Sequence, residues 1–195
     1  MSYLLADLDA AAAVLIDPRS ADLPVLQAML DEHRLNLRWV LRTHEHDSQM
    51  HGEAEALQAL GAPCIAHSVP QANDGFLAFG NEYMRVMATP GHTPGCLSFL
   101  WRDRLFCGGL MAVDACPYQP RPAMPEALWD SVMNKVFTLP SETLLFGNPA
   151  YRSRSVSNVL EQRRAHPWFA GASRDEFLSR VTISSSTTIT QALIR

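Results

Sequence analysis

Apolar residues in the first third of the chain alternate between short continuous runs and helical spacing. Four such runs lie at residues 3–6, 12–16, 37–41 and 63–66. Each is short, rich in apolar residues and bounded by polar or turn-forming residues, which is typical of a buried strand. Leucines and a methionine recur every three to four residues from residue 23 to about residue 33, and a second helical pattern covers residues 53–60. This alternation predicts an α/β arrangement in layers.

The second half of the chain begins with strand patterns and ends with helical ones. Strands are predicted at residues 83–88, 96–101, 104–107 and 143–146, and helices at residues 126–136, 157–165 and 173–181. Three of these strands follow one another across short turns, which predicts a second, mostly antiparallel sheet. Four prolines between residues 117 and 125 exclude a helix or a central strand and predict an ordered or lid-like loop.

Length and composition favour one globular domain. The chain has 195 residues, of which 47% are hydrophobic and 18% charged, and one domain usually takes about 100–200 residues. We expect this domain to span residues 1–181, followed by a Ser/Thr-rich, β-prone tail at residues 182–195.

Charge and hydrophobicity exclude several classes of partner. Sixteen Lys and Arg against 20 Asp and Glu give a net charge of −4, so no basic surplus is available to neutralise a phosphate backbone and nucleic-acid binding is not expected. No apolar run approaches the length of a bilayer span, and no basic segment opens a signal peptide. We therefore expect a cytoplasmic protein without membrane contacts. The four cysteines form no C-x-x-C pair, which favours reduced thiols.

Two histidines one residue apart are the first sign of metal chemistry. His44 and His46 follow the strand predicted at residues 37–41, and on an extended segment their imidazoles point the same way and can share one cation. A third histidine would complete such a site. His92 is the natural candidate, because it lies in the Pro-Gly-His-Thr-Pro-Gly turn of residues 90–95, where glycine lets the backbone approach another group closely.

Six segments, in this order, carry a resemblance to a known family. They are residues 3–7 (YLLAD), 14–18 (VLIDP), 43–46 (THEH), 88–96 (ATPGHTPGC), 135–140 (KVFTLP) and 156–159 (VSNV). The chain resembles the metallo-β-lactamase superfamily over residues 3–181, most closely its persulfide dioxygenases, with the hydroxyacylglutathione hydrolases (glyoxalase II) as near relatives. The resemblance implies an α/β fold, the αββα sandwich of the metallo-β-lactamase type, with a metal site at the edge between two sheets.

Several metal ligands of that family are replaced in this chain. The positions that replace family ligands are, in chain order, Ser48, Gln49, Gly108 or Gly109, and Pro149. The arginine of the persulfide dioxygenases aligns near Pro117. The retained residues His44, His46 and His92 are the three histidines of a single metal site, whereas the second site and the bridging aspartate are missing. The resemblance therefore implies a degenerate site that holds one ion at most.

Three readings of function remain open. The first is a divergent persulfide dioxygenase-like protein with one iron or zinc ion, acting on or binding a small thiol or persulfide. The second is a catalytically inactive pseudoenzyme, with or without metal, that binds a small ligand or a protein partner. The third is a mononuclear zinc hydrolase of thioesters. Conventional hydrolysis is disfavoured, because it uses a hydroxide held between two metals and an orienting carboxylate.

Four further residues are candidates for a role near the metal site. Either Asp47 and His51 reach the metal in a rearranged loop, or Asp47 faces solvent and His51 lies at the start of a helix. Tyr151 follows the position of the last family histidine. Cys116 is either a reactive thiol near the mouth of the site or a packed loop cysteine. Family members usually carry a further strand before the segment at residues 3–7, so a sheet edge is left bare. Either the tail at residues 182–190 or a second subunit, in a homodimer, would cover it.

Overall fold

The computed structural model of the protein describes residues 1–46, 53–66, 74–147 and 156–192. The strands are β1 (Tyr3–Asp7), β2 (Ala12–Ile16), β3 (Asn36–Leu41), β4 (Cys64–Ile65), β5 (Gly75–Phe79), β6 (Glu82–Ala88), β7 (Leu97–Trp101), β8 (Arg104–Gly108), β9 (Leu144–Gly147) and β10 (Val156–Asn158). The helices are α1 (Leu23–Glu32), α2 (Glu53–Gln58), α3 (Pro125–Ser131), α4 (Val159–Ala165) and α5 (Arg174–Ala192), with a 3-10 turn at Ser20–Asp22 and a π-helical turn at Val132–Val136 that continues α3. Most of the predicted elements are confirmed.

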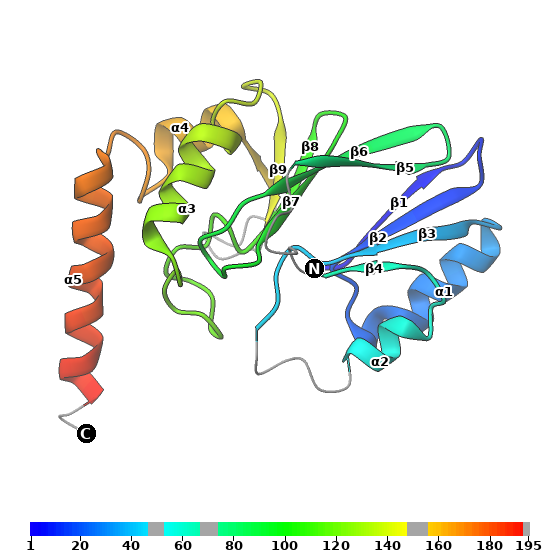
Figure 1. The fold of residues 1–195 in the computed structure, drawn as a ribbon, viewed down its shortest axis with the longest axis horizontal. Coiled ribbons are helices and arrows are strands. Elements are labelled where there is room, and N and C mark those ends of the chain that lie inside the picture. The colour runs from blue at the N-terminus through cyan, green and yellow to red at the C-terminus, as the bar shows by residue number, and fades with distance from the viewer. Residues whose placement is uncertain (47–52, 67–73, 148–155, 193–195) are drawn as a thin grey trace.

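Two sheets form the middle of the molecule and helices cover their outer faces (Figure 1). The first sheet has the strand order β1-β2-β3-β4, and the second has the order β10-β9-β8-β7-β6-β5. The first sheet carries α1 and α2, the second carries α3 and α4, and α5 lies beside α3 at the outer edge of the molecule. All consecutive pairs from β5 to β8 are antiparallel, as predicted, whereas β8 and β9 are parallel. The structure is thus the αββα sandwich that the sequence predicts.

A dense apolar core joins the two sheets. Its buried members are Leu5, Val14, Ile16, Leu41, Phe79, Met84, Leu97, Phe99 and Phe106. Every residue of β2 is buried, because this strand lies inside its sheet with a helical layer on one side and the second sheet on the other. A second core, which includes Trp129, Val132, Phe169 and Phe177, lies between the second sheet and its helices. Both layers of the sandwich are therefore held by apolar burial.

Three elements differ from the sequence-based expectation. Strand β5 was not predicted, because it begins with glycine and its apolar residues face alternately inward and outward, with Phe76 exposed. The short strand β10 takes the place of the first residues of the helix expected at residues 157–165. That helix begins at Val159, because the Asn158 side chain accepts a hydrogen bond from the backbone N–H of Glu161 at 2.8 Å and caps it.

The tail is helical, so a covering strand at residues 182–190 is wrong. Helix α5 runs from Arg174 to Ala192 and lies on the side of the molecule away from β1 (Figure 1). The hydroxyl of Thr182 donates a 2.9 Å hydrogen bond to the carbonyl of Leu178, which shows how a β-prone residue is accommodated in a helix. In the described part of the chain, β1 pairs with β2 alone and remains an edge strand.

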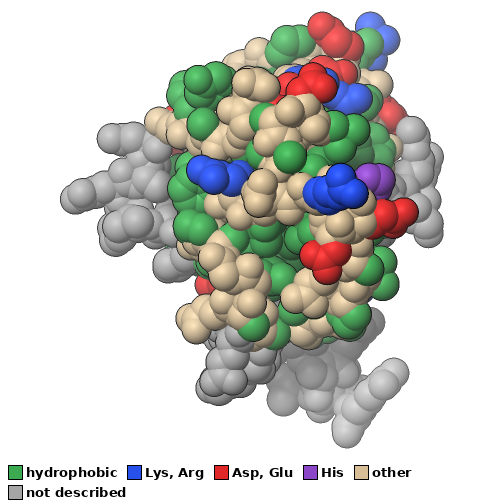
Figure 2. All heavy atoms as spheres, turned by 90° about the vertical axis from the view of Figure 1, so that its right-hand side faces the viewer, with side chains coloured by type: hydrophobic (Ala, Val, Ile, Leu, Met, Phe, Trp, Pro, Cys, Tyr) green, Lys and Arg blue, Asp and Glu red, His purple; other side chains and the backbone are tan. Residues whose placement is uncertain are grey.

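Surface charge is mixed on the face at the right of Figure 1, where the turns between β1 and β2 and between β5 and β6 lie. There, Lys and Arg side chains lie among acidic and apolar ones and do not form a single basic area (Figure 2). Among the described residues, no helix combines the length and the apolar character that a membrane crossing requires.

Candidate metal centre

The two sheets meet at the ends of β3 and β6, and this junction brings three histidines together. Thr43, His44 and His46 follow β3, and His92 lies in the turn between β6 and β7. The backbone N–H of Leu97 donates to the carbonyl of Thr43 at 2.8 Å, which ties the two segments to each other. The retained histidines of the H-x-H motif and the Pro-Gly-His turn therefore come from different sheets and converge at one point.

The three imidazoles are arranged as the ligands of one ion would be. Their potential ligand atoms all lie within 4.8 Å of one another. The ring centroids are 5.0 Å apart for His44 and His46, 5.1 Å for His44 and His92, and 5.3 Å for His46 and His92, with interplanar angles between 78° and 89°. Rings that meet edge to face can direct one nitrogen each at a common point. The set thus fits a divalent cation that prefers imidazole nitrogen, such as zinc or iron.

A short chain of hydrogen bonds orients His44. Asp17 Oδ1 accepts the backbone N–H of Thr43 at 2.7 Å, and Asp17 Oδ2 accepts the Thr43 hydroxyl at 2.7 Å. Because that hydroxyl proton is used, Thr43 Oγ1 accepts from Nδ1–H of His44 at 2.8 Å. The bond leaves Nε2 of His44 with its lone pair for a cation. Burial raises the pKa of Asp17, and its hydrogen bonds from Thr43 oppose that rise.

The turn that carries His92 is packed against the start of α3. A β-carbon on Gly91, whose φ is +146°, would lie 2.3 Å from the Cα of Leu128, so only glycine permits this approach. Ser131 Oγ donates to the carbonyl of Pro90 at 2.7 Å, and the N–H of Met124 donates to the carbonyl of Gly91 at 3.0 Å. The proline-rich segment before α3 thereby holds the turn in place.

Burial keeps His44 and His92 neutral. It lowers the pKa of His44 to about 3 and that of His92 to about 4, and the neighbouring imidazoles contribute in the same direction. His92 is only 1% exposed, and both of its ring nitrogens lack a hydrogen-bond partner in the described structure. A buried polar group without a partner costs about 1–3 kcal/mol. A bound cation would satisfy one of these nitrogens, so the donor set fits a metal ion.

Cys116 and Tyr118, from the loop before α3, lie beside His46. Cys116 is buried, and its Sγ lies 3.4 Å from Nε2 of His46. The ring of Tyr118 lies 5.8 Å from the ring of His46, centroid to centroid. The sequence had raised Cys116 only as a thiol near the mouth or a packed loop cysteine, and the structure shows it packed. These contacts could not be predicted from a sequence motif, because about 70 residues separate Cys116 and Tyr118 from His46.

The positions that replace the family carboxylate are filled by glycine, and imidazoles stand close to both. A β-carbon on Gly109 would lie 2.8 Å from Nε2 of His92, and one on Gly108 would lie 2.8 Å from Nδ1 of His44. Both glycines therefore belong to the wall of the site. Among the described residues, the three histidines make up the one group of metal-binding side chains with this close spacing.

Several predicted positions lie outside the described residues. They are the candidates Asp47, His51 and Tyr151, and the replaced ligand positions Ser48, Gln49 and Pro149. Pro117, which aligns near the family arginine, is exposed in the loop before α3. His166 is buried but does not join the histidine group, and its Nε2 lies 3.0 Å from the carbonyl oxygen of Met111.

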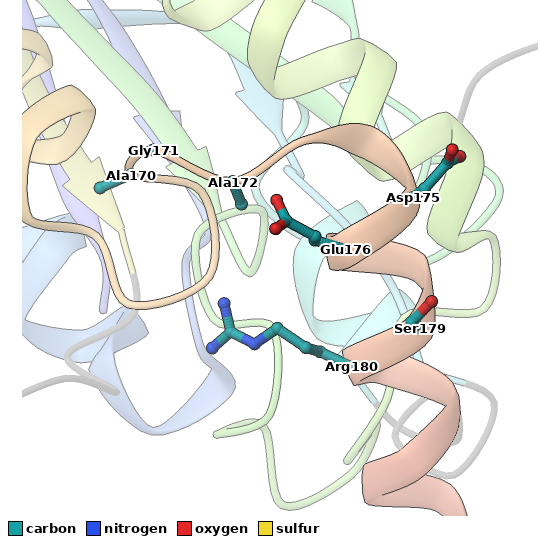
Figure 3. A pocket seen from close by; sticks show the side chains of 7 residues that line it. All are labelled: Ala170, Gly171, Ala172, Asp175, Glu176, Ser179 and Arg180. Atoms are coloured by element: carbon teal, nitrogen blue, oxygen red, sulfur yellow. The ribbon is translucent and has the colours of Figure 1, made fainter.

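A pocket at the start of α5 is separate from the histidines (Figure 3). Two of its charged side chains, Arg180 and Glu176, have partners within the chain. The guanidinium of Arg180 donates to the carbonyl of Pro167 at 2.8 Å and lies over the ring of Trp168. The carboxylate of Glu176 accepts from the backbone N–H and the hydroxyl of Ser173. These contacts stabilise the helix start, and the pocket gathers no further group of metal-binding residues.

Comparison with known proteins identifies relatives with this architecture. No family model matches the chain. It is 31% identical to the human mitochondrial persulfide dioxygenase ETHE1, over 85% of this chain and 70% of the relative. It is 31% identical to a hydroxyacylglutathione hydrolase of Vibrio cholerae, over 99% of this chain and 77% of the relative.

A solved structure supports the same assignment. The crystal structure of ETHE1 from Myxococcus xanthus superposes with a TM-score of 0.80 and 31% identity, covering 93% of this chain and 84% of that chain. The B3 metallo-β-lactamase BLEG-1 shares the fold, with a TM-score of 0.69 at 21% identity, over 87% of this chain and 94% of that one. The chain therefore belongs to the metallo-β-lactamase superfamily, in the group that contains the persulfide dioxygenases and hydroxyacylglutathione hydrolases.

Proposed function

We propose that the protein is a mononuclear metalloprotein of the persulfide dioxygenase type, which holds one iron or zinc ion and acts on a small thiol or persulfide. The observation that carries this proposal is the convergence of His44, His46 and His92, with both nitrogens of the buried His92 unpartnered. The persulfide dioxygenases among the relatives support the class of substrate.

The side chains of this chain have distinct tasks in the proposed site. The three neutral imidazoles bind the ion, Asp17 and Thr43 orient His44, and the burial of His46 and His92 keeps bulk water away. When bound, iron supplies redox chemistry for the transfer of oxygen to sulfur, since three protein donors leave coordination positions open. Three histidines provide the facial donor set without a carboxylate.

The same site disfavours conventional hydrolysis. Hydrolases of this superfamily use a hydroxide that two metals and a carboxylate hold in place. Glycine occupies positions 108 and 109, where the bridging carboxylate is expected, and no described carboxylate joins the histidine group. A zinc hydrolase of thioesters with one ion is the weaker candidate for this reason.

The glycines also support an alternative without turnover. A protein that has lost the carboxylate and the substrate arginine could keep the fold as a pseudoenzyme that binds a small thiol or a protein partner. In that case the histidines would serve structure or ligand binding. The four cysteines are free in the structure, which fits a reducing compartment such as the cytoplasm for either function.

A second copy of the chain is the partner we propose for the edge of β1. The tail is helical and β1 is an edge strand in the described residues, so a strand of a second subunit could pair with it. Sedimentation velocity at several protein concentrations tests this proposal. A dimer that dissociates when a proline replaces an edge residue of β1 supports it, and a monomer at all concentrations contradicts it.

Metal analysis combined with oxygen uptake tests the proposed activity. The protein is expressed with both iron and zinc supplied, purified without chelator and assayed for oxygen consumption with glutathione persulfide. About one iron per chain and oxygen uptake that His92→Ala abolishes would support the proposal. The exposed His33 provides the control, since His33→Ala removes a histidine away from the site.

Other outcomes assign the protein to the alternatives. About one zinc per chain, with thioester hydrolysis and no oxygen uptake, would favour the hydrolase. Less than about a tenth of a metal per chain, unchanged after reconstitution, would overturn the metalloenzyme and leave a binding protein.

A further inference from the structure

The contact between Cys116 and His46 links the loop before α3 to the H-x-H motif. Cys116 is 5% exposed and its Sγ lies 3.4 Å from Nε2 of His46. Among the described side chains that could bind a cation, the closely spaced group consists of the three histidines and leaves Cys116 out. The sulfur therefore contacts one imidazole of the group without joining the group itself.

The two nitrogens of an imidazole point in different directions, so the contact of one bears on the role of the other. Nε2 of His46 faces Cys116 at 3.4 Å, and a cation shared with His44 and His92 would then be bound through Nδ1. A nitrogen that binds a cation uses its lone pair, and a neutral ring then carries its proton on the other nitrogen. Nε2–H of His46 would in that case donate its hydrogen bond to the Cys116 sulfur.

Independent evidence for a cation comes from His92. Its side chain is 1% exposed and both ring nitrogens are unpartnered in the described structure. His44, in contrast, is held through Nδ1 by Thr43. One imidazole is thus held by a hydroxyl, one contacts a thiol and one is buried without a partner, and their potential ligand atoms lie within 4.8 Å of one another.

We propose that Cys116 is a positioning residue, whose sulfur accepts a hydrogen bond from Nε2–H of His46 and thereby directs Nδ1 toward the metal. Histidine ligands usually donate their second N–H to a carboxylate, a carbonyl or water. Here a buried sulfur takes that place. The inference rests on the metal centre of the proposed function and adds to it a residue that the H-x-H motif does not contain.

Metal affinity separates this role from simple packing. The zinc dissociation constant is measured by competition with a chromophoric chelator for wild type, Cys116→Ala and Cys116→Ser. Loss of the acceptor in Cys116→Ala should weaken zinc binding about 10–100-fold, the range for partners that orient a ligand. Cys116→Ser keeps an acceptor and should recover most of the affinity.

Cys107 provides a matched control. Its thiol is also buried, but it donates to the carbonyl of Phe146 at 3.6 Å instead of contacting a histidine. Cys107→Ala should therefore leave the zinc dissociation constant unchanged while removing a thiol of similar burial. Equal affinities of wild type and Cys116→Ala would overturn the proposal.

Spectroscopy of the wild-type protein gives a test that does not depend on any variant folding. Nitrogen NMR of the isotope-labelled, zinc-loaded protein should show a protonated Nε2 and a metal-bound Nδ1 for His46, and the reverse assignment would overturn the proposal. A sulfur-to-metal charge-transfer band in the cobalt(II)-loaded protein that Cys116→Ser abolishes would make Cys116 a ligand and overturn the positioning role. If wild type binds neither zinc nor cobalt, the proposed metal centre itself is wrong, which is a different result.

Discussion

Gly109 leaves the imidazole of His92 a space that no other residue would leave. A β-carbon at Gly109 would lie 2.5 Å from Cδ2 and 2.8 Å from Nε2 of His92, and real β-carbons essentially never approach another atom so closely. Gly109 is one of the two positions, with Gly108, at which the family resemblance places the bridging carboxylate, and a side chain at Gly109 would collide with a histidine of the site. The ring of His92 now stands where the side chain of that residue would begin.

Restoring the carboxylate should accordingly fail to restore a second metal site. We expect Gly109→Asp to bind less metal than wild type and to lose about 1–3 kcal/mol of unfolding free energy, the usual cost of overpacking. Gly109→Ala adds only the β-carbon and should account for most of that loss. Metal content per chain and urea unfolding measure both effects. A variant with two metals per chain would refute this prediction.

Metal removal should lower thermal stability. An ion that binds only the folded protein raises the free energy of unfolding by about 2.7 kcal/mol when its free concentration is a hundredfold above its dissociation constant. For a chain of this length, that corresponds to a fall of about 5–10 °C in Tm after dialysis against a chelator. Calorimetry of wild type and His92→Ala provides the measurement. The chelator should leave the Tm of the variant unchanged, and an unchanged Tm of wild type would argue against a bound ion.

Stability of the metal-free protein should decrease on mild acidification. Burial lowers the pKa of His44 to about 3 and that of His92 to about 4, whereas the pKa in an unfolded chain is about 6.5. Below pH 6.5 the unfolded chain therefore binds protons that the folded chain does not, so unfolding free energy falls as pH drops from about 6.5 toward about 4. The slope approaches about 1.4 kcal/mol per pH unit for each of the two groups.

Urea unfolding at several pH values between about 4.5 and 7.5 measures that slope. His92→Leu removes one of the two groups and should make the dependence shallower. A slope that is the same in wild type and His92→Leu would contradict the prediction.

The hydrogen bonds around Thr43 should set the metal affinity of His44. Thr43→Val keeps the shape of the side chain but removes the oxygen that joins Asp17 to Nδ1 of His44. We expect zinc binding about 10–100-fold weaker, measured by chelator competition. Thr43→Ser retains the hydroxyl and should bind zinc nearly as well as wild type. Equal affinity in the valine variant would show that His44 needs no such support.

Local patterns account for most of the fold. Continuous apolar runs and helical spacing predicted β2, β3 and α1 close to their observed limits, because these elements bury whole faces and their patterns are strong. The strand predicted at residues 182–190 was wrong for the opposite reason, because no strong apolar pattern supported it. The Ser and Thr residues favour a strand only by propensity, and in the observed helix their hydroxyls can bond to backbone carbonyls, as that of Thr182 does.

The H-x-H spacing and the Pro-Gly-His turn single out His44, His46 and His92 without any knowledge of the fold. The residues that surround these histidines follow only from the way the chain packs. Asp17 reaches Thr43 across 26 positions of the chain and Cys116 reaches His46 across 70. Such contacts cannot be predicted from sequence spacing, because they depend on how two sheets and a loop pack at one edge. Sequence spacing indicates which residues can bind an ion, whereas tertiary packing sets the orientation of their side chains.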